Sequence, residues 1–467
     1  MEGNRAHVVV IGAGISGLAA AWYLNQGAGE RVKVTVLEGS PRVGGKLYAS
    51  EVAGVSVDAG AEAMLARRPE GKELAKAVGL GDDLVFPGTT RSAVYTRGAL
   101  RYLPKGQVMG VPSDLTELAK SGIVSPGGLL RVPLDQILPA TLVRTDVSVA
   151  AYIRARMGAE VVDRLVEPLL GGVYAGRADQ LSLEATMPRV AAMARSERSL
   201  LSAARQLAAE TPKEAGPVFT TLKNGVGGLP EAVGKASGAD IRTGVTVREL
   251  HRTEAGWRLV TGPVPRPEVI EADAVIVATP GPAASRLLKA EAPKAASELA
   301  RIQYASMAVV TLAYPVDAFP EPPAASGYLV PPVERRPVKA VTFSSVKWPH
   351  LARDLVLLRC SIGRLGEEHL LQREDAELVS LATAEMGDVM GVRGLPVDTR
   401  VTRWGGGLPQ YNVGHLDRVA RVRAAVAVQP GLAVCGAAYD GIGIPACVST
   451  ARTAAARILD HLTRRGE

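Results

Sequence analysis

Three glycines near the N-terminus have a spacing that indicates the binding of an anion. Residues 12–17 read GAGISG, and they follow a short apolar string at residues 7–11 and precede a helical stretch. Gly12 allows a tight turn, Gly14 lets the backbone approach an anion, and Gly17 lets a helix pack closely on a strand. The first amides of that helix favour negative charge at the same place. The spacing therefore predicts a pyrophosphate-binding site.

The elements around this motif must form one βαβ unit. A second strand is expected at residues 32–37 and ends at Glu38, about 20 positions after the last glycine, where an acid accepts ribose hydroxyls. The next segment, residues 42–46, reads RVGGK. A basic glycine turn at this place would border the phosphates and the ribityl chain of a flavin, and a simple NAD dehydrogenase has no need of it. We therefore predict that the nucleotide is FAD.

Two later segments complete the predicted cofactor domain. Residues 273–280 read as a strand that closes on the cofactor, after a hairpin-like stretch at 241–260 in which Val247 should lie near the adenine. Near the C-terminus, a buried strand at 432–436 leads through 441–445 into an amphipathic helix that continues to about residue 462. The first turn of that helix would stabilise the negative charge of a reduced flavin.

The order of these pieces predicts an interrupted architecture. A chain of 467 residues is too long for one ordinary core. We predict an α/β fold with a Rossmann-like FAD-binding domain of the two-dinucleotide-binding-domain type, made of residues 1–66, 220–285 and 400–467. The segment 67–219 is expected to be a mainly helical lobe, and 286–399 a mixed substrate-binding sheet that roofs the flavin.

Composition excludes several other classes of protein. The net charge of +7 comes more from arginine than from lysine, which favours carboxylates and phosphates as ligands, and the absence of single-sign charge blocks gives no reason to expect nucleic-acid binding. The three cysteines form no CxxC pair and the six histidines lack ligand spacing, so we predict no metal and no disulfide framework. The sequence has no leader and no apolar run of membrane-spanning length, so we expect a cytoplasmic protein.

With these motifs in place, the chain resembles the oxygen-dependent protoporphyrinogen/coproporphyrinogen oxidase family, a branch of the flavin monoamine oxidase superfamily. The resemblance covers nearly the whole chain. Segments typical of the superfamily are 8–17, 37–39, 44–46 and 57–62. Segments typical of the narrower family are 166–176 (VEPLLGGVYAG), 408–415 (LPQYNVGH) and 441–448 (GIGIPACV).

The resemblance implies which residues form the FAD site. They are Gly12, Ala13, Gly14, Ile15, Ser16, Gly17, Glu38, Gly39, Gly45, Lys46, Gly60, Ala61, Glu62, Ala63, Val247, Trp404, Gly436, Ile442, Gly443 and Ile444. The family usually carries glycine, proline, an acid and serine near the isoalloxazine ring, and residues 60–63 read GAEA here. Contacts through the backbone are expected to survive, whereas the serine hydroxyl has no counterpart.

The activity that the resemblance implies is oxidation of coproporphyrinogen III to coproporphyrin III in haem biosynthesis. Six electrons leave the macrocycle in three flavin cycles, and O2 reoxidises FAD and forms H2O2 each time. Oxidation of protoporphyrinogen IX is the alternative. Hydride transfer to flavin N5 needs close placement and exclusion of water more than a protein nucleophile, so we name no catalytic acid or base.

The choice between the two porphyrinogens depends on carboxylate binding. Coproporphyrinogen III has four propionates and protoporphyrinogen IX has two, so the former needs more cations. Arg67 and Arg68 closely follow the 60–63 loop, and the resembling enzymes of Gram-positive bacteria carry a basic residue there. We predict that at least one binds a propionate, Arg68 first; the alternative is that both are solvated charges of the loop. Tyr174, in the glycine-bracketed loop 171–176, is a further candidate for contact with the macrocycle, and packing is its alternative role.

Other readings of the same fold remain open. An amine oxidase would carry an aromatic cage with a tyrosine before the C-terminal helix, and residues 440–445 contain no aromatic. A carotenoid desaturase is disfavoured by the arginines and by the 408–415 string, and a non-catalytic protein of the GDP-dissociation-inhibitor kind by the retained flavin motifs. The resemblance also leaves open transient docking with a ferrochelatase and peripheral membrane contact, although the Pro- and Gly-broken segment 115–142 favours core packing.

Overall fold

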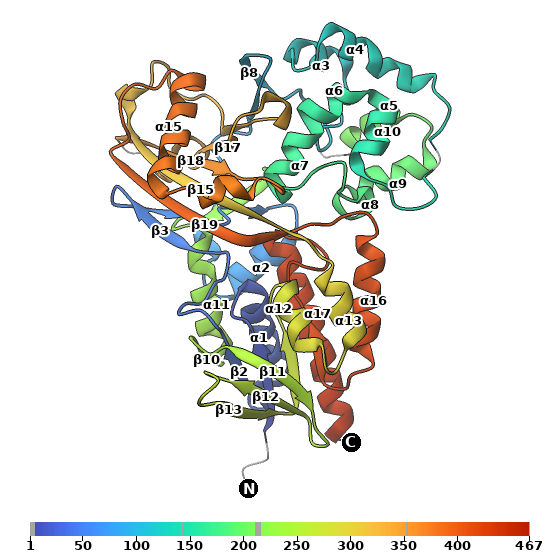
Figure 1. The fold of residues 1–467 in the computed structure, drawn as a ribbon, viewed down its shortest axis with the longest axis vertical. Coiled ribbons are helices and arrows are strands. Elements are labelled where there is room, and N and C mark those ends of the chain that lie inside the picture. Colours follow the sequence, from blue (N-terminus) through green and yellow to red (C-terminus); the bar gives the residue numbers. More distant parts are fainter. Residues whose placement is uncertain (1–4, 142, 211–215, 352–353, 467) are drawn as a thin grey trace.

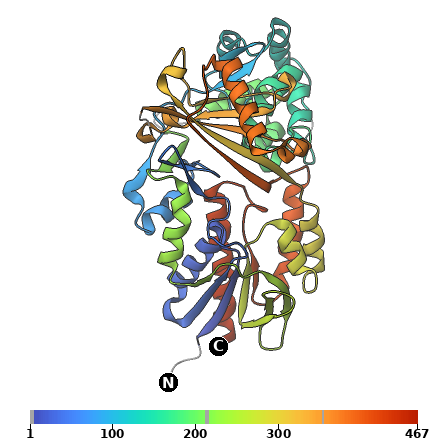
Figure 2. The same ribbon diagram turned by 60° about the vertical axis from the view of Figure 1, so that its left-hand side comes forward.

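The computed structural model describes residues 5–141, 143–210, 216–351 and 354–466. The described part of the chain divides into a lower half, which carries both ends of the chain, and an upper half (Figure 1). A mixed sheet with helix α15 and a group of helices from α3 to α10 lie side by side in the upper half, in the view of Figure 1 and in the turned view of Figure 2.

The lower half is built on a five-stranded parallel sheet in the order β10-β2-β1-β14-β20. Val8 and Val10 of β1 pack towards helices α1 and α17, and Val9 and Ile11 pack towards the opposite core, as expected of a parallel sheet that is covered on both faces. The predicted βαβ unit is therefore present. The bounds are β1 Ala6–Ile11, β2 Val32–Leu37, β10 Asp240–Arg242, β14 Ala274–Val277, β20 Leu432–Val434, α1 Ile15–Ala28 and α17 Ile444–Gly466.

A three-stranded antiparallel sheet and three helices cover the second face of the parallel sheet. The hairpin predicted for residues 241–260 begins only at β11. The prediction was wrong for residues 241 and 242, because Ile241 and Arg242 pair with β2 in the parallel sheet. The bounds are β11 Val247–Arg252, β12 Trp257–Thr261, β13 Glu268–Ala272, α12 Gly281–Leu288, α13 Pro293–Ala300 and α16 His415–Ala427.

The upper sheet has seven strands in the order β19-β15-β18-β17-β16-β7-β8, and α15 (Asp375–Met390) covers one of its faces. It includes the strands expected at 308–314, 338–343 and 355–362. Strands β7 and β8 come from the segment expected to be mainly helical, and β19 crosses residue 400; the division into domains stays a prediction. The bounds are β7 Ala93–Thr96, β8 Ala99–Tyr102, β15 Tyr304–Pro315, β16 Gly327–Leu329, β17 Val338–Phe343, β18 Leu355–Ile362 and β19 Asp398–Pro409.

Short helices form the rest of the upper half around one core. An internal ion pair between Arg156 and Asp135, 2.5 Å apart at their closest nitrogen and oxygen, joins two of its segments, and both side chains are almost fully buried. The bounds are α3 Leu115–Ser121, α4 Pro126–Arg131, α5 Val149–Met157, α6 Ala159–Val161, α7 Glu167–Tyr174, α8 Leu183–Thr186, α9 Pro188–Ser196 and α10 Leu200–Ala209.

The expected core packing of residues 115–142 holds only in part. Leu118 and Val132 are buried, whereas the side chains of Leu130 and Ile137 are 73% and 71% exposed, because α4 and the turn after it lie at the outer end of the molecule. Leu142 lies outside the described residues. Among the described helices, none is long and apolar enough to cross a membrane.

Smaller elements connect the two halves. Strands β3 and β4 form a hairpin, β5, β6 and β9 form a short sheet, and α2 and α11 flank α1 and α17. A small helix, α14, follows β17. The bounds are β3 Ala49–Val52, β4 Val55–Asp58, β5 Met64–Leu65, β6 Leu84–Val85, β9 Phe219–Leu222, α2 Pro69–Ala77, α11 Leu229–Ser237 and α14 Ser344–Lys347.

Candidate cofactor site

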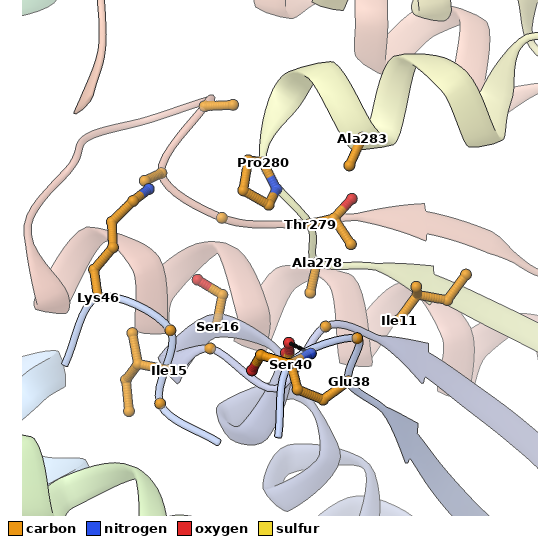
Figure 3. Close-up of a pocket in the computed structure, with 18 of the residues that line it drawn as sticks. Ile11, Ile15, Ser16, Glu38, Ser40, Lys46, Ala278, Thr279, Pro280 and Ala283 are labelled. Atoms are coloured by element: carbon orange, nitrogen blue, oxygen red, sulfur yellow. Dashed lines mark hydrogen bonds between the residues drawn. The ribbon is translucent and has the colours of Figure 1, made fainter. Parts of the chain in front are cut away.

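A cavity of about 710 Å³ lies at the carboxyl ends of the parallel strands β1, β2, β14 and β20. Ligands of open α/β sheets bind at this edge, and the volume is typical of ligand pockets. Figure 3 shows part of the cavity wall, with Ile11 of β1, Glu38 after β2, Ala278, Thr279 and Pro280 after β14, and Ala283 of α12 among the residues that line it.

The glycine motif forms the turn between β1 and α1. Gly12 has φ +103°, a conformation that favours glycine, and a Cβ on Gly17 would lie 1.8 Å from the Gly12 carbonyl oxygen. A Cβ on Gly14 would meet nothing within 4 Å. The first and third glycines are therefore required by the close turn, and the space beside Gly14 is left open at the start of α1.

Glu38 lies at the end of β2 and is held by the backbone. Its Oε2 accepts a hydrogen bond from the Ala13 amide at 2.7 Å, and its Oε1 accepts one from the Ser40 amide at 2.8 Å. Each carboxylate oxygen keeps further lone pairs that can accept hydroxyl groups. The acid is therefore oriented at the cavity wall before any ligand arrives (Figure 3).

The basic glycine turn lies directly beside the glycine motif. The Gly44 amide donates to the Ala13 carbonyl at 2.8 Å, and Gly14 and Gly44 form an isolated parallel bridge. Lys46 extends from this turn along the cavity, where burial lowers the pKa of its ammonium. The arrangement places amides and one cation on the same side of the cavity.

The start of the C-terminal helix forms another wall. Ile442, Ile444 and Cys447 line the cavity, and Gly436 adopts φ +128° where the chain leaves β20. Amides at the beginning of α17 therefore border the cavity and favour negative charge there.

The loop at residues 60–63 closes the cavity from the side of the upper sheet. A Cβ on Gly60 would lie 2.0 Å from the Lys46 carbonyl oxygen, and Ala61 lines the cavity. Glu62 points away from it and forms ion pairs with Lys347 and with Arg359, whose Nη1 is 2.7 Å from Glu62 Oε2. Burial alone would raise the pKa of Glu62, but the two cations lower it to about 2.

Predicted cofactor residues divide into two groups. Those that line the cavity are Gly12, Gly14, Ile15, Ser16, Glu38, Gly39, Gly45, Lys46, Ala61, Val247, Trp404, Gly436, Ile442 and Ile444. Those that do not line it are Ala13, Gly17, Gly60, Glu62, Ala63 and Gly443. Several of the second group still support the wall, as Gly17 and Glu62 do. Their roles in cofactor binding stay predictions.

The segment predicted to close on the cofactor, residues 273–280, does reach the cavity. Strand β14 ends at Val277, and Ala278, Thr279 and Pro280 after it line the cavity. The sequence reading missed Ala283 and Arg286 of α12 and Arg248 of β11, which also line it. No motif marks the two arginines.

Two of these residues carry buried polar atoms without a partner. Thr279 Oγ1 and Arg248 Nε make no hydrogen bond among the described residues, and both residues line the cavity. Buried polar atoms are normally paired, so these two indicate a polar ligand. The residues present therefore fit a dinucleotide that ends in a flavin.

The predicted substrate residues lie outside this cavity. Arg68 immediately precedes α2, and its Nη2 lies 2.7 Å from Glu70 Oε1. Arg67 is exposed. Tyr174 is the last residue of α7 and not part of a loop, as had been expected, because the helix continues through Gly171 and Gly172.

Tyr174 packs inside the helical part. Its ring centroid lies 5.6 Å from that of Tyr411, and its side chain is 7% exposed. Burial raises the pKa of its hydroxyl to about 12. These contacts favour the packing role over contact with a macrocycle.

Comparison with known proteins identifies the class of this fold and site. Residues 15–459 match the family model of flavin containing amine oxidoreductases, so the chain belongs to this family of flavin enzymes. Solved amine oxidases such as cyclohexylamine oxidase of Brevibacterium oxydans IH-35A share the fold at a TM-score of 0.70 and 20% identity.

Within that class, the chain belongs to the coproporphyrinogen III oxidase family. It is 34% identical to coproporphyrinogen III oxidase of Bacillus subtilis (strain 168), over 99% of this chain and 100% of the relative. It is 40% identical to coproporphyrinogen III oxidase of Mycobacterium leprae (strain TN), over 95% and 96%. A crystal structure from Exiguobacterium sp. 255-15, named as a protoporphyrinogen oxidase, matches with TM-score 0.87 and 31% identity over 98% and 99%.

Proposed function

We propose that this chain is an FAD- and O2-dependent oxidase that converts coproporphyrinogen III to coproporphyrin III. The observation that carries the proposal is the full-length similarity to coproporphyrinogen III oxidases from several genera, at 30% to 40% identity. The cavity at the carboxyl edge of the parallel sheet supports it, because it carries the features that a flavin dinucleotide needs.

FAD fits this cavity along its length. Glu38 would accept the ribose hydroxyls, the 12–17 turn would hold the pyrophosphate, and the start of α17 would face the flavin ring. Bound FAD supplies the hydride acceptor and passes the electrons to O2. The protein's own contribution is to orient the ring and to exclude water from it.

Two side chains would help to orient the ring. Trp404 lines the cavity and its Nε1 donates to the Ala59 carbonyl at 2.9 Å. Arg359 holds the Gly60 carbonyl from the opposite sheet through Nη2 at 2.5 Å. Both contacts hold the two residues that directly precede Ala61, the residue of this loop that lines the cavity.

Arg68 is the proposed partner of a substrate propionate. A Cβ on Gly71 of α2 would lie 3.7 Å from Ile444 Cγ2 and 3.4 Å from Pro445 Cγ, so α2 lies against the start of α17. This contact supports a position of Arg68, at the N-terminal end of α2, near the end of the cavity where the flavin ring would lie. The Arg68 side chain is 42% exposed, and among the described residues its guanidinium pairs with Glu70 alone, so it retains donors for a carboxylate.

Oxidation of protoporphyrinogen IX is the second candidate. The name given to the Exiguobacterium structure favours it, and so does the 27% identity to the chloroplastic protoporphyrinogen oxidase of Nicotiana tabacum. The identity to the coproporphyrinogen III oxidases is higher, and the two adjacent arginines suit a substrate with more carboxylates.

An anaerobic reduction experiment tests the proposal. The FAD-loaded enzyme is mixed with coproporphyrinogen III, protoporphyrinogen IX or benzylamine, and the visible absorption of oxidised flavin is followed. We expect coproporphyrinogen III to bleach the flavin fastest and the colour to return with air. Bleaching by the amine alone would move the chain to the amine oxidases. The cytoplasmic location and the transient contact with a ferrochelatase stay predictions.

A further inference from the structure

A second, much smaller cavity lies between the cofactor half and the seven-stranded sheet. Its volume is about 20 Å³. Its lining includes Asp58, at the end of β4 in the cofactor half, and Ser344, Trp348 and Arg359, which come from β18 and from the segment after β17. A cavity needs at least about 10–15 Å³ to hold one water molecule. The space therefore suits a single molecule of that size.

Three side chains of this wall have buried polar atoms without a partner. Ser344 Oγ, Trp348 Nε1 and Arg359 Nε make no hydrogen bond among the described residues. The three residues are 3%, 2% and 9% exposed, so bulk solvent does not reach them freely. Leaving such groups unpaired costs about 1–3 kcal/mol each. Three unpaired atoms at one cavity indicate a ligand there.

The chemistry of these atoms limits what the ligand can be. Indole and guanidinium N–H groups only donate, so the ligand must accept at least two hydrogen bonds. Asp58 accepts from the Val226 amide at 3.0 Å and the Gly227 amide at 2.8 Å, and its oxygens keep lone pairs for a donor. The ligand must therefore also be able to donate.

Ions fit this environment poorly. An anion would lie next to the carboxylates of Asp58 and Glu62, which line the same cavity. A cation would meet the guanidinium of Arg359, and no cluster of three or more metal-ligating side chains occurs in the described ranges. Only a neutral molecule that both accepts and donates matches all four side chains.

We propose that one ordered water occupies this cavity, accepts hydrogen bonds from Arg359 Nε and Trp348 Nε1, shares a hydrogen bond with Ser344, and donates to Asp58. The site is independent of the proposed function. It has a consequence for the cofactor cavity, because the other nitrogens of Arg359 hold Glu62 and the Gly60 carbonyl. The water supplies the hydrogen bond that Arg359 Nε otherwise lacks, and so holds this guanidinium in place next to the 60–63 loop.

The direct test is a crystal structure of the wild-type protein at a resolution that places waters, with a second crystal soaked in bromide. We expect one water peak within roughly 2.7–3.2 Å of at least three of the four side chains. No peak in the cavity, or an anomalous bromide peak inside it, would overturn the proposal.

A pair of variants tests the same site in solution. Ser344→Thr adds one methyl group, which would fill the space, and Ser344→Ala leaves the space open. If the water is present, the threonine variant displaces it and should melt roughly 2–5 °C below the alanine variant, because donors lose their partner. If the cavity is dry, filling it favours packing, and a threonine variant that melts at or above the alanine variant would refute the water site.

Discussion

Arg359 of strand β18 donates a hydrogen bond of 2.7 Å to Glu62, which lies next to the cavity-lining Ala61. The two residues are 297 positions apart in the chain. Lys347 binds the same carboxylate from α14. These two ion pairs connect the upper sheet to the loop that borders the cofactor cavity.

The substitution Arg359→Met should destabilise the protein by about 3 kcal/mol, since it leaves a buried carboxylate with one partner fewer. It should also increase the rate of FAD release, because the Gly60 carbonyl loses its donor. Urea unfolding and flavin fluorescence measure the two effects. Arg373→Met is the matched control, because Arg373 pairs with Glu377 on the exposed surface at 3.8 Å and should cost less than about 0.5 kcal/mol. Equal changes in the unfolding free energy and in FAD release for the two variants would argue against a role of the Arg359–Glu62 pair in holding this loop.

The substitution Glu38→Gln should weaken FAD binding roughly 10- to 100-fold, because a charged acceptor of the ribose hydroxyls becomes neutral. The fold should persist, since an amide oxygen can still accept from Ala13 or Ser40. Titration of the apoprotein with FAD gives the dissociation constant. Glu51→Gln, on the exposed side of β3, serves as control and should leave the constant unchanged. Unaltered binding in Glu38→Gln would remove this residue from the site.

Two glycine substitutions separate folding from binding. Gly17→Ala forces a Cβ to within 1.8 Å of a carbonyl oxygen, so both stability and FAD content should fall. Gly14→Ala meets nothing within 4 Å, so the apoprotein should melt normally but bind FAD poorly, because the methyl group takes the space of the pyrophosphate. Gly228→Ala, also without near neighbours, is the control. Normal FAD binding by Gly14→Ala would contradict the assignment.

Asp58 should give the protein a distinctive pH dependence. Burial raises the pKa of its carboxyl to about 6, from an ordinary value of 3.8. The folded state therefore binds more protons than the unfolded state between these values, and this group's contribution to stability falls as the pH rises from about 4 to about 6. Asp58→Asn should remove that part of the slope. Unfolding free energies at several pH values measure it, and a variant with an unchanged slope would show that Asp58 does not titrate there.

The substitution Arg68→Glu should raise KM for coproporphyrinogen III at least about 10-fold, because a charge-assisted bond to a propionate becomes a repulsion. The effect on kcat should be small, since Arg68 does not line the flavin cavity. Lys76→Glu makes the same charge change on the exposed face of α2 and is the control. Should KM stay unchanged in Arg68→Glu, the propionate would have to bind elsewhere.

The sequence predicted the nucleotide half well because its signals are local. Gly12, Gly17 and Glu38 act within one βαβ unit, and their roles depend on short-range sterics. The start of α17 was also predicted, since a strand followed by a glycine-rich turn precedes it.

Contacts between distant segments could not be predicted in this way. Lys347 and Arg359 follow no motif, and only the packing of the sheet on the 60–63 loop brings them to Glu62. Tyr174 was placed in a loop because glycines surround it, yet α7 continues through Gly171 and Gly172 and packs against strands β16 and β17. Leu130 and Ile137 look like core residues by type, and only the tertiary position of α4 exposes them.

The central claim is that this flavin enzyme acts on coproporphyrinogen III. It is tested most directly by kcat/KM of the purified, FAD-loaded protein in air with coproporphyrinogen III and with protoporphyrinogen IX, with H2O2 counted in the same reactions. We predict a higher kcat/KM for coproporphyrinogen III and about three H2O2 for each porphyrin formed, one for each two-electron flavin cycle. A higher value for protoporphyrinogen IX, or no porphyrin from either substrate, would contradict the account.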